Sequence, residues 1–125
     1  MHKVFVYGTL KKGHGNHERL LASNSKFIGN ACTEPIFTML HLGGFPGIVL
    51  GGHTPIKGEL FEVDAETLAR LDHLEGHPNF YQRVPVATTL EDGTLIPAEG
   101  YVLPEKWLGD ERIKTIPSGV WGEAR

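Results

Sequence analysis

Two stretches of this 125-residue chain carry residue types that could do chemistry. The first is the strand-like run 4–7 with the turn that follows it at Gly8 and Thr9. Such a turn can aim successive backbone N–H groups at one point and form a small anion-binding nest. An ordinary solvated turn after a strand explains the same residues, and this stretch alone does not decide between the two. The second is Glu75, a carboxylate placed where it could carry a proton.

The clearest predicted helix covers residues 65–75 and ends at Glu75. Asp64 is a suitable N-cap residue, Gly76 suits the C-terminal cap, and Pro78 prevents the helix from continuing. An apolar stripe along one face of the helix is formed by three leucines: Leu68, Leu71 and Leu74. We therefore expect the helix to pack on the body of the protein through this stripe.

Glu75 projects from the apolar face of this helix. At ~100° per residue it falls between Leu68 and Leu71 rather than on the solvated side. Partial burial and the negative end of the helix dipole both disfavour a charged carboxylate. They should raise the pKa of Glu75 toward the range that suits a general base or acid near neutral pH. The alternative is a frayed helix end at which Glu75 reaches water or pairs with Arg83. Asp72, on the flank of the stripe, is the weaker candidate.

Short strands and tight turns are expected to hold these groups, because 16 glycines and eight prolines do not suit a helical bundle. The run 4–7 is entirely apolar, so it should be a central strand that is covered on both faces. Other strands are expected as two segments between residues 26 and 42, then at 48–50, 55–63, 80–90 and 94–103, with a short helix at 16–22. Residues 91–93 form a hairpin turn of the Asp-Gly type, and Pro85 places that hairpin at a sheet edge or a bulge. Glu59, in the 55–63 strand, is a secondary candidate among the carboxylates that could take part in chemistry.

The composition is that of a soluble globular protein, with 40% hydrophobic and 22% charged residues. The formal net charge is −3 and no basic cluster exceeds the Lys11-Lys12 pair, so nucleic acid is not an expected partner. No apolar run approaches the roughly 20 residues of a membrane span, and no secretory signal is visible. We expect a cytoplasmic protein with one domain over residues 1–125, whose tail at 104–125 packs on the rest.

Cysteine and histidine patterns do not indicate a metal site. Cys32 is the single cysteine, which excludes an intrachain disulfide and a Cys-rich zinc site. His14 and His17 are three residues apart, but they lie in a glycine-rich turn with no carboxylate partner at ligand spacing. Residues 8–13 are not a phosphate loop, because no Gly-Lys-Ser/Thr follows. We expect no metal and no cofactor.

Four motifs together resemble the γ-glutamylcyclotransferase-like family, in particular its γ-glutamylamine cyclotransferase branch and the small bacterial homologues. In chain order they are residues 4–10 with Tyr7-Gly8-Thr9-Leu10, then Phe45-Pro46-Gly47, then Lys57-Gly58-Glu59-Leu60-Phe61, and finally residues 71–75 followed by Tyr81-Gln82-Arg83. Each motif alone is weak, but the four occur in the right order and spacing over about residues 3–103. The family commonly has serine where this chain has Thr9, and residues from 104 onward match nothing in it firmly.

The resemblance implies an α+β fold, a small mixed β-barrel of short strands with about two short helices, in which the turn and Glu75 face one cavity. It implies release of 5-oxoproline and a free amine from a small-molecule γ-glutamylamine or γ-glutamyl peptide, without cofactor or metal. Glu75 would be the catalytic residue, and Arg83 would form a structural ion pair. The substrate-binding residues would be Tyr7, Gly8, Thr9, Leu10 and Tyr81. A non-catalytic small-anion binding module, or an interaction protein with a vestigial cavity, remains the alternative on the same scaffold.

Overall fold

The structure is a computed structural model that describes residues 1–8, 11 and 25–122. Its elements in chain order are β1 His2–Val6, β2 Ser25–Thr33, β3 Phe37–His41, β4 Pro46–Leu50, β5 Lys57–Val63, α2 Ala65–Glu75, β6 Gln82–Leu90, β7 Leu95–Val102, the 3-10 helix η1 Glu105–Gly109 and β8 Lys114–Thr115. The expected α+β class is confirmed. The helix expected at 16–22, together with Thr9 and Leu10, lies outside the described residues.

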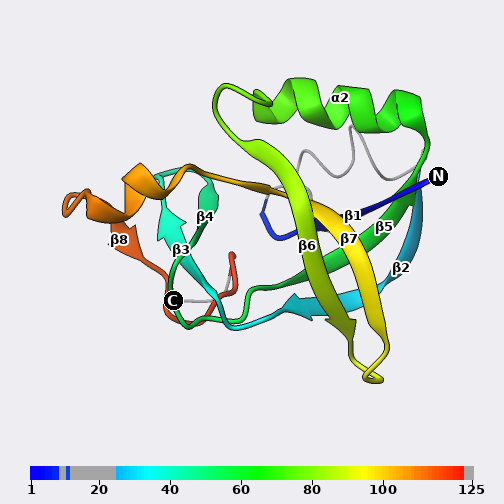
Figure 1. The fold of residues 1–125 in the computed structure, drawn as a ribbon, viewed down its shortest axis with the longest axis horizontal. Helices are drawn as coiled ribbons and strands as arrows, with labels where there is room; N and C mark the ends of the chain where they lie inside the picture. Colours follow the sequence, from blue (N-terminus) through cyan, green and yellow to red (C-terminus); the bar gives the residue numbers. More distant parts are fainter. Residues whose placement is uncertain (9–10, 12–24, 123–125) are drawn as a thin grey trace.

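Within the described part of the chain, five strands close into a barrel in the order β1-β5-β2-β6-β7, and a smaller sheet has the order β4-β3-β8. Figure 1 shows α2 lying along one side of the barrel strands, with the smaller sheet beside them. β1 pairs with β5 in antiparallel and with β7 in parallel orientation. It is therefore an interior strand, as its apolar run predicted, and the expected small barrel is confirmed.

β1 separates two clusters of buried apolar side chains. Val4 and Val6 belong to the cluster that includes the leucines of α2. Phe5 and Tyr7 belong to the other cluster. Successive residues of a strand point to opposite faces, so a strand that is covered on both sides needs apolar residues at every position. All four side chains are buried, and β1 thus brings the turn at Gly8 to the boundary between the two clusters.

β6 and β7 form the expected hairpin around residues 91–93. Pro85 lies opposite Glu99 of β7, whereas β2 reaches β6 only at residues 88–90. The missing N–H of Pro85 therefore falls where β6 has a single partner strand, in agreement with the expected edge position.

The tail packs on the rest of the protein as far as it is described. Trp107 and Trp121 pack against the two apolar clusters, and β8 pairs with β3. None of the helices described has the length and apolarity needed to cross a membrane. The described residues also contain no group of three His, Cys, Asp or Glu side chains close enough to hold a metal ion.

Candidate active site

A cavity of about 450 Å³ lies between the end of β1, the connection from β3 to β4, and the end of α2. Its described lining consists of Phe5, Val6, Tyr7, Gly8, Gly44, Phe45, Pro46, Leu74, Glu75, Phe80, Tyr81 and Tyr101. Four of the predicted site residues are among them: Tyr7, Gly8, Glu75 and Tyr81. The other two, Thr9 and Leu10, lie outside the described residues. The fold thus brings the start of the first turn and the end of the helix to one space.

Local interactions fix both ends of the helix that carries Glu75. At the start of α2, Asp64 Oδ1 accepts a hydrogen bond from the Thr67 N–H at 2.8 Å. At its end, Gly76 adopts a left-handed conformation with φ 69°, which glycine reaches without steric cost. Leu68 and Leu71 are buried on the face toward the barrel. The predicted caps and bounds are confirmed, and Glu75 is the last residue of the helix.

Glu75 is the only carboxylate in the described lining of the cavity. Burial raises the pKa of Glu75 to about 7, because a desolvated carboxylate is destabilised relative to its neutral acid. No hydrogen bond or ion pair from the described residues reaches its carboxyl group to offset this effect. The expected rise in the pKa is confirmed, and desolvation is its cause.

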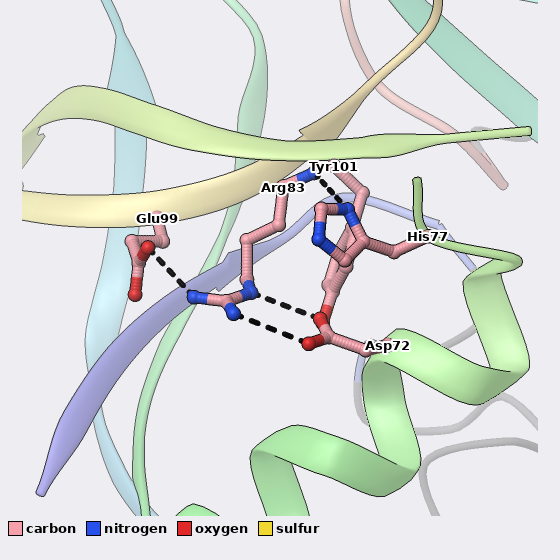
Figure 2. A network of polar contacts seen from close by, with 5 residues as sticks. All are labelled: Asp72, His77, Arg83, Glu99 and Tyr101. Atoms are coloured by element: carbon pink, nitrogen blue, oxygen red, sulfur yellow. Dashed lines mark hydrogen bonds and ion pairs between the residues drawn. The ribbon is translucent and has the colours of Figure 1, made fainter. Parts of the chain in front are cut away.

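Arg83 does not pair with Glu75, so the expected alternative of a Glu75–Arg83 pair is wrong. Its guanidinium group contacts Asp72 at 2.9 Å and Glu99 at 2.8 Å instead (Figure 2). The expectation of an ion pair for Arg83 is confirmed, and its partners are now identified. Asp72 lies on the flank of the stripe, and sequence reasoning treated it as the weaker candidate for catalysis. In the structure it is a partner in this ion pair.

Three tyrosines of the described lining hold the cavity walls together through their hydroxyl groups. The Tyr7 hydroxyl donates to the Tyr101 carbonyl at 2.6 Å and accepts from the Ile48 N–H at 3.2 Å. The Tyr81 hydroxyl donates to the Pro46 carbonyl, and the Tyr101 hydroxyl donates to Asp72 Oδ1 at 2.7 Å. Burial raises the pKa values of all three phenols, which therefore stay protonated and keep donating these bonds. Tyr81 thus lines the cavity with its hydroxyl proton already engaged.

Gly8 begins the turn that the sequence suggested as a nest. A Cβ atom at this position would lie 2.9 Å from Pro46 Cγ, a ring that cannot turn aside. The Lys11 N–H donates to the Gly8 carbonyl at 3.1 Å, and the Lys11 ammonium donates to the Trp121 carbonyl at 2.6 Å. The absence of a side chain at Gly8 therefore lets the backbone of the turn approach the start of β4.

Sequence reasoning did not single out Phe80 and Tyr101, which complete the described lining. Phe80 lies edge-on to Tyr81, Trp107 and Phe45, at ring-centroid distances of 4.9, 5.6 and 6.3 Å. For Tyr101 the sequence carried a signal. Counting residues outward along both strands from the turn at 91–93 places Tyr101 opposite Arg83, as the hairpin register shows. For Phe80 the sequence carries no comparable signal.

The sequence is similar to proteins of known family. Residues 4–123 match the family described as gamma-glutamyl cyclotransferase, AIG2-like. A Methanocaldococcus jannaschii protein provisionally named a gamma-glutamylcyclotransferase is 45% identical over 106 residues, covering 84% of this chain and 87% of the relative. The gamma-glutamylaminecyclotransferase of Rattus norvegicus is 38% identical over 93 residues, covering 66% of this chain and 60% of the relative.

The fold has a counterpart among solved structures as well. The crystal structure of an AIG2-like protein from Mus musculus superposes with a TM-score of 0.76 at 30% identity, and the match covers 100% of this chain and 97% of that chain. The match to the family spans most of the sequence and includes residues 4–6 of β1 and Glu75. This chain belongs to the gamma-glutamyl cyclotransferase, AIG2-like family.

Proposed function

We propose that Glu75 carries the protons in a reaction that releases 5-oxoproline and a free amine from a γ-glutamylamine or γ-glutamyl peptide. The reaction class follows from membership of the family. The observation that carries the role of Glu75 is its position in the cavity wall, where burial raises its pKa to about 7. A carboxyl group with that pKa is populated in both protonation states near neutral pH.

The substrate supplies every atom of the products. Its α-amine nitrogen attacks the γ-carbonyl carbon, a C–N bond forms and closes the five-membered ring, and the bond to the leaving nitrogen breaks. The α-ammonium nitrogen loses two protons in becoming the ring amide, and the leaving nitrogen gains two in becoming an ammonium ion. Because nucleophile and electrophile belong to one molecule, the protein needs only to select the reactive conformation.

Glu75 can serve both proton transfers in turn. Only the neutral amine attacks, so the ionised carboxylate first accepts a proton from the α-ammonium group. The resulting neutral acid then donates this proton to the departing nitrogen. A second round of the same exchange moves the second proton from the ring nitrogen to the released amine. A pKa near that of the medium suits an acid–base group that works in both directions, because neither protonation state is strongly disfavoured.

The turn after β1 is proposed to hold the α-carboxylate and the developing oxyanion through backbone N–H groups. Its members are Tyr7, Gly8, Thr9 and Leu10. The position of Tyr7 and Gly8 in the cavity wall supports this assignment, and Thr9 and Leu10 follow from the resemblance of the motif. Fixed backbone donors in a site of low polarity stabilise charge that develops during the reaction. Tyr81 is proposed to contact the substrate from the opposite wall.

A non-catalytic anion-binding module is not favoured, because the relatives are named as cyclotransferases. A lone carboxylate would also weaken the binding of an anion in this cavity. The proposal further includes a cytoplasmic location and a small-molecule substrate. The free thiol of Cys32 supports the location, and membership of the family supports the substrate class. The net charge of −3 argues against nucleic acid as a partner.

The test is an assay of a panel of γ-glutamyl amides and peptides for 5-oxoproline and free amine. We expect both products in equal amounts from at least one panel member, and their formation at least ~10²-fold slower with the Glu75→Gln variant. Glutamate in place of 5-oxoproline would mean hydrolysis by water and would contradict the proposal. Binding of panel compounds without turnover would favour the binding module.

A further inference from the structure

Two carboxylates in the last turn of α2 have different surroundings. Asp72 and Glu75 are three residues apart and therefore neighbours along the helix. Asp72 accepts bonds from two side chains, whereas Glu75 faces the cavity with no partner among the described residues. Both lie at the negative end of the helix dipole, where a cation is stabilising. The cation that the structure supplies, Arg83, is bound to Asp72 alone of the two.

The contacts of Asp72 tie the helix to both strands of the hairpin, as Figure 2 shows. Arg83 Nε and Nη2 donate to the two carboxylate oxygens of Asp72 at 2.9 and 3.2 Å. Arg83 Nη1 donates to Glu99 Oε2 at 2.8 Å, and the Tyr101 hydroxyl donates to Asp72 Oδ1 at 2.7 Å. Such a bidentate pair fixes the relative orientation of the two side chains as well as the distance between them. The side chains of Asp72 and Arg83 are only 21% and 22% exposed, so solvent screens this pair less than a surface pair.

Arg83 also holds the segment that leaves the helix. Its backbone N–H donates to His77 Nδ1 at 3.0 Å, while its side chain holds Asp72. The segment between Asp72 and Arg83 is therefore closed at two points by one residue. Glu75 lies within this closed segment, and its carbonyl accepts the Tyr81 N–H at 3.3 Å. Movement of Glu75 relative to the cavity would require these contacts to change.

We propose that the Asp72–Arg83 pair is a positioning device that holds the last turn of α2, and with it the Glu75 carboxyl group, against the cavity wall. Neither residue is placed in contact with the reacting atoms. This inference rests on the proposed function for its effect on catalysis, but its effect on Glu75 can be measured separately. A displacement of about 1 Å in a catalytic group lowers rates by as much as about a hundredfold, so a device of this kind would matter for turnover.

The positive charge of Arg83 is paired with the carboxylates of Asp72 and Glu99 and not with that of Glu75. The titratable groups of the described residues that act electrostatically with Glu75 are three phenols: Tyr7, directly after β1, Tyr81, and Tyr101 of β7. The loss of Arg83 should shift the pKa of Glu75 in one direction if Arg83 acts by positioning, and in the other direction if it acts only through its charge. Removing a nearby cation alone would raise the pKa of Glu75, whereas loosening the turn admits water and lowers it.

The experiment uses Arg83→Lys and Arg83→Gln, with Arg70→Gln as the matched control. Arg70 pairs with Glu66 at 2.7 Å on the exposed side of the same helix, remote from the cavity lining. Two quantities are measured: kcat and KM for 5-oxoproline formation, and the titration of the Glu75 carboxyl carbon by NMR. We expect Arg83→Lys to lower kcat by about tenfold or more with KM changed far less, because lysine keeps the charge but loses the fork.

In Arg83→Gln we expect the pKa of Glu75 to move down from about 7 toward its ordinary value, and in Arg70→Gln we expect neither quantity to change. A pKa of Glu75 that stays or rises in Arg83→Gln would overturn the positioning role, whatever the value of kcat. A downward shift with unchanged kcat would uphold positioning and contradict the proton-carrying role of Glu75. If an Arg83 variant does not fold, Asp72→Glu displaces the carboxylate by one methylene and is expected to move both quantities in the same directions.

Discussion

The two ends of α2 place two carboxylates in opposite environments. At the N-terminal end, Asp64 is exposed, and a hydrogen bond from the Thr67 backbone lowers its pKa. At the C-terminal end, Glu75 faces the cavity, and desolvation raises its pKa to about 7. The helix dipole reinforces the contrast, because it stabilises negative charge at the first end and destabilises it at the second.

The two carboxylates therefore differ in their relation to the fold. Asp64 stabilises the fold, whereas the fold destabilises the ionised form of Glu75. Asp64 satisfies a backbone donor that the first turn of a helix leaves free. Glu75 receives no such compensation from the described residues, so its ionised form is destabilised in the folded protein. Because of this, the carboxyl group still holds its proton at a pH near neutral and can donate it there. Substitutions at the two ends should therefore have different consequences for activity and for stability.

The largest expected difference is in catalysis. Glu75→Gln should lower the rate of 5-oxoproline formation by at least ~10²-fold, because it removes the acid–base group but keeps the size of the side chain. Asp64→Asn retains a capping oxygen and should leave the rate within about twofold. Steady-state assays of both variants under one set of conditions test this. Equal losses in the two variants would attribute the effect to the helix rather than to Glu75.

The second difference is in how stability depends on pH. The pKa of Glu75 is about 7 in the folded protein and 4.5 in its ordinary state, so folding favours the protonated form. Its contribution to stability is present below 4.5 and is lost as the pH rises to about 7. At about pH 8, Glu75→Gln should therefore be more stable than the unsubstituted protein by about 1–3 kcal/mol.

Urea denaturation at about pH 5 and about pH 8 measures this gain, which should be smaller at the lower pH. Asp64→Asn provides the control, because the pKa of Asp64 is lowered and its contribution is lost only as the pH falls below its ordinary value of 3.8. A gain that is equal at the two pH values would contradict an ionised, desolvated Glu75.

The smallest expected effect concerns the cap itself. Asp64→Ala removes the oxygen that accepts the Thr67 N–H and should lower Tm by roughly 2–6 °C. Turnover measured well below Tm should be unchanged, since Asp64 is remote from the cavity lining. An unchanged Tm would show that the hydrogen bond to Thr67 does not stabilise the helix start.

Features set by local sequence were predictable. The apolar run of β1, the caps of α2 and the Asp-Gly hairpin each follow from the preferences of a few adjacent residues. The closure of the barrel was not specified by such patterns, because the parallel pairing of Val4 with Glu99 joins segments almost a hundred residues apart. The resemblance to a family supplied that part of the fold.

The candidate site was predictable to the same extent. Helical periodicity placed Glu75 on the buried face, and the expected rise in its pKa followed from that position. The partners of Arg83 could not be chosen from the sequence, because Asp72, Glu75 and Glu99 all offer a carboxylate and only the docking of α2 on the hairpin decides among them. The contribution of Phe80 to the cavity likewise depends on how the segment after the helix folds back.

The central claim, that Glu75 carries the protons, is tested most directly by the pH dependence of kcat/KM. The carboxylate must be ionised to accept a proton, so the rate should fall on the acid side with an apparent pKa of about 7. The residual activity of Glu75→Gln should lack this acid limb. An acid limb near the ordinary glutamate value, or one that persists in Glu75→Gln, would contradict the account.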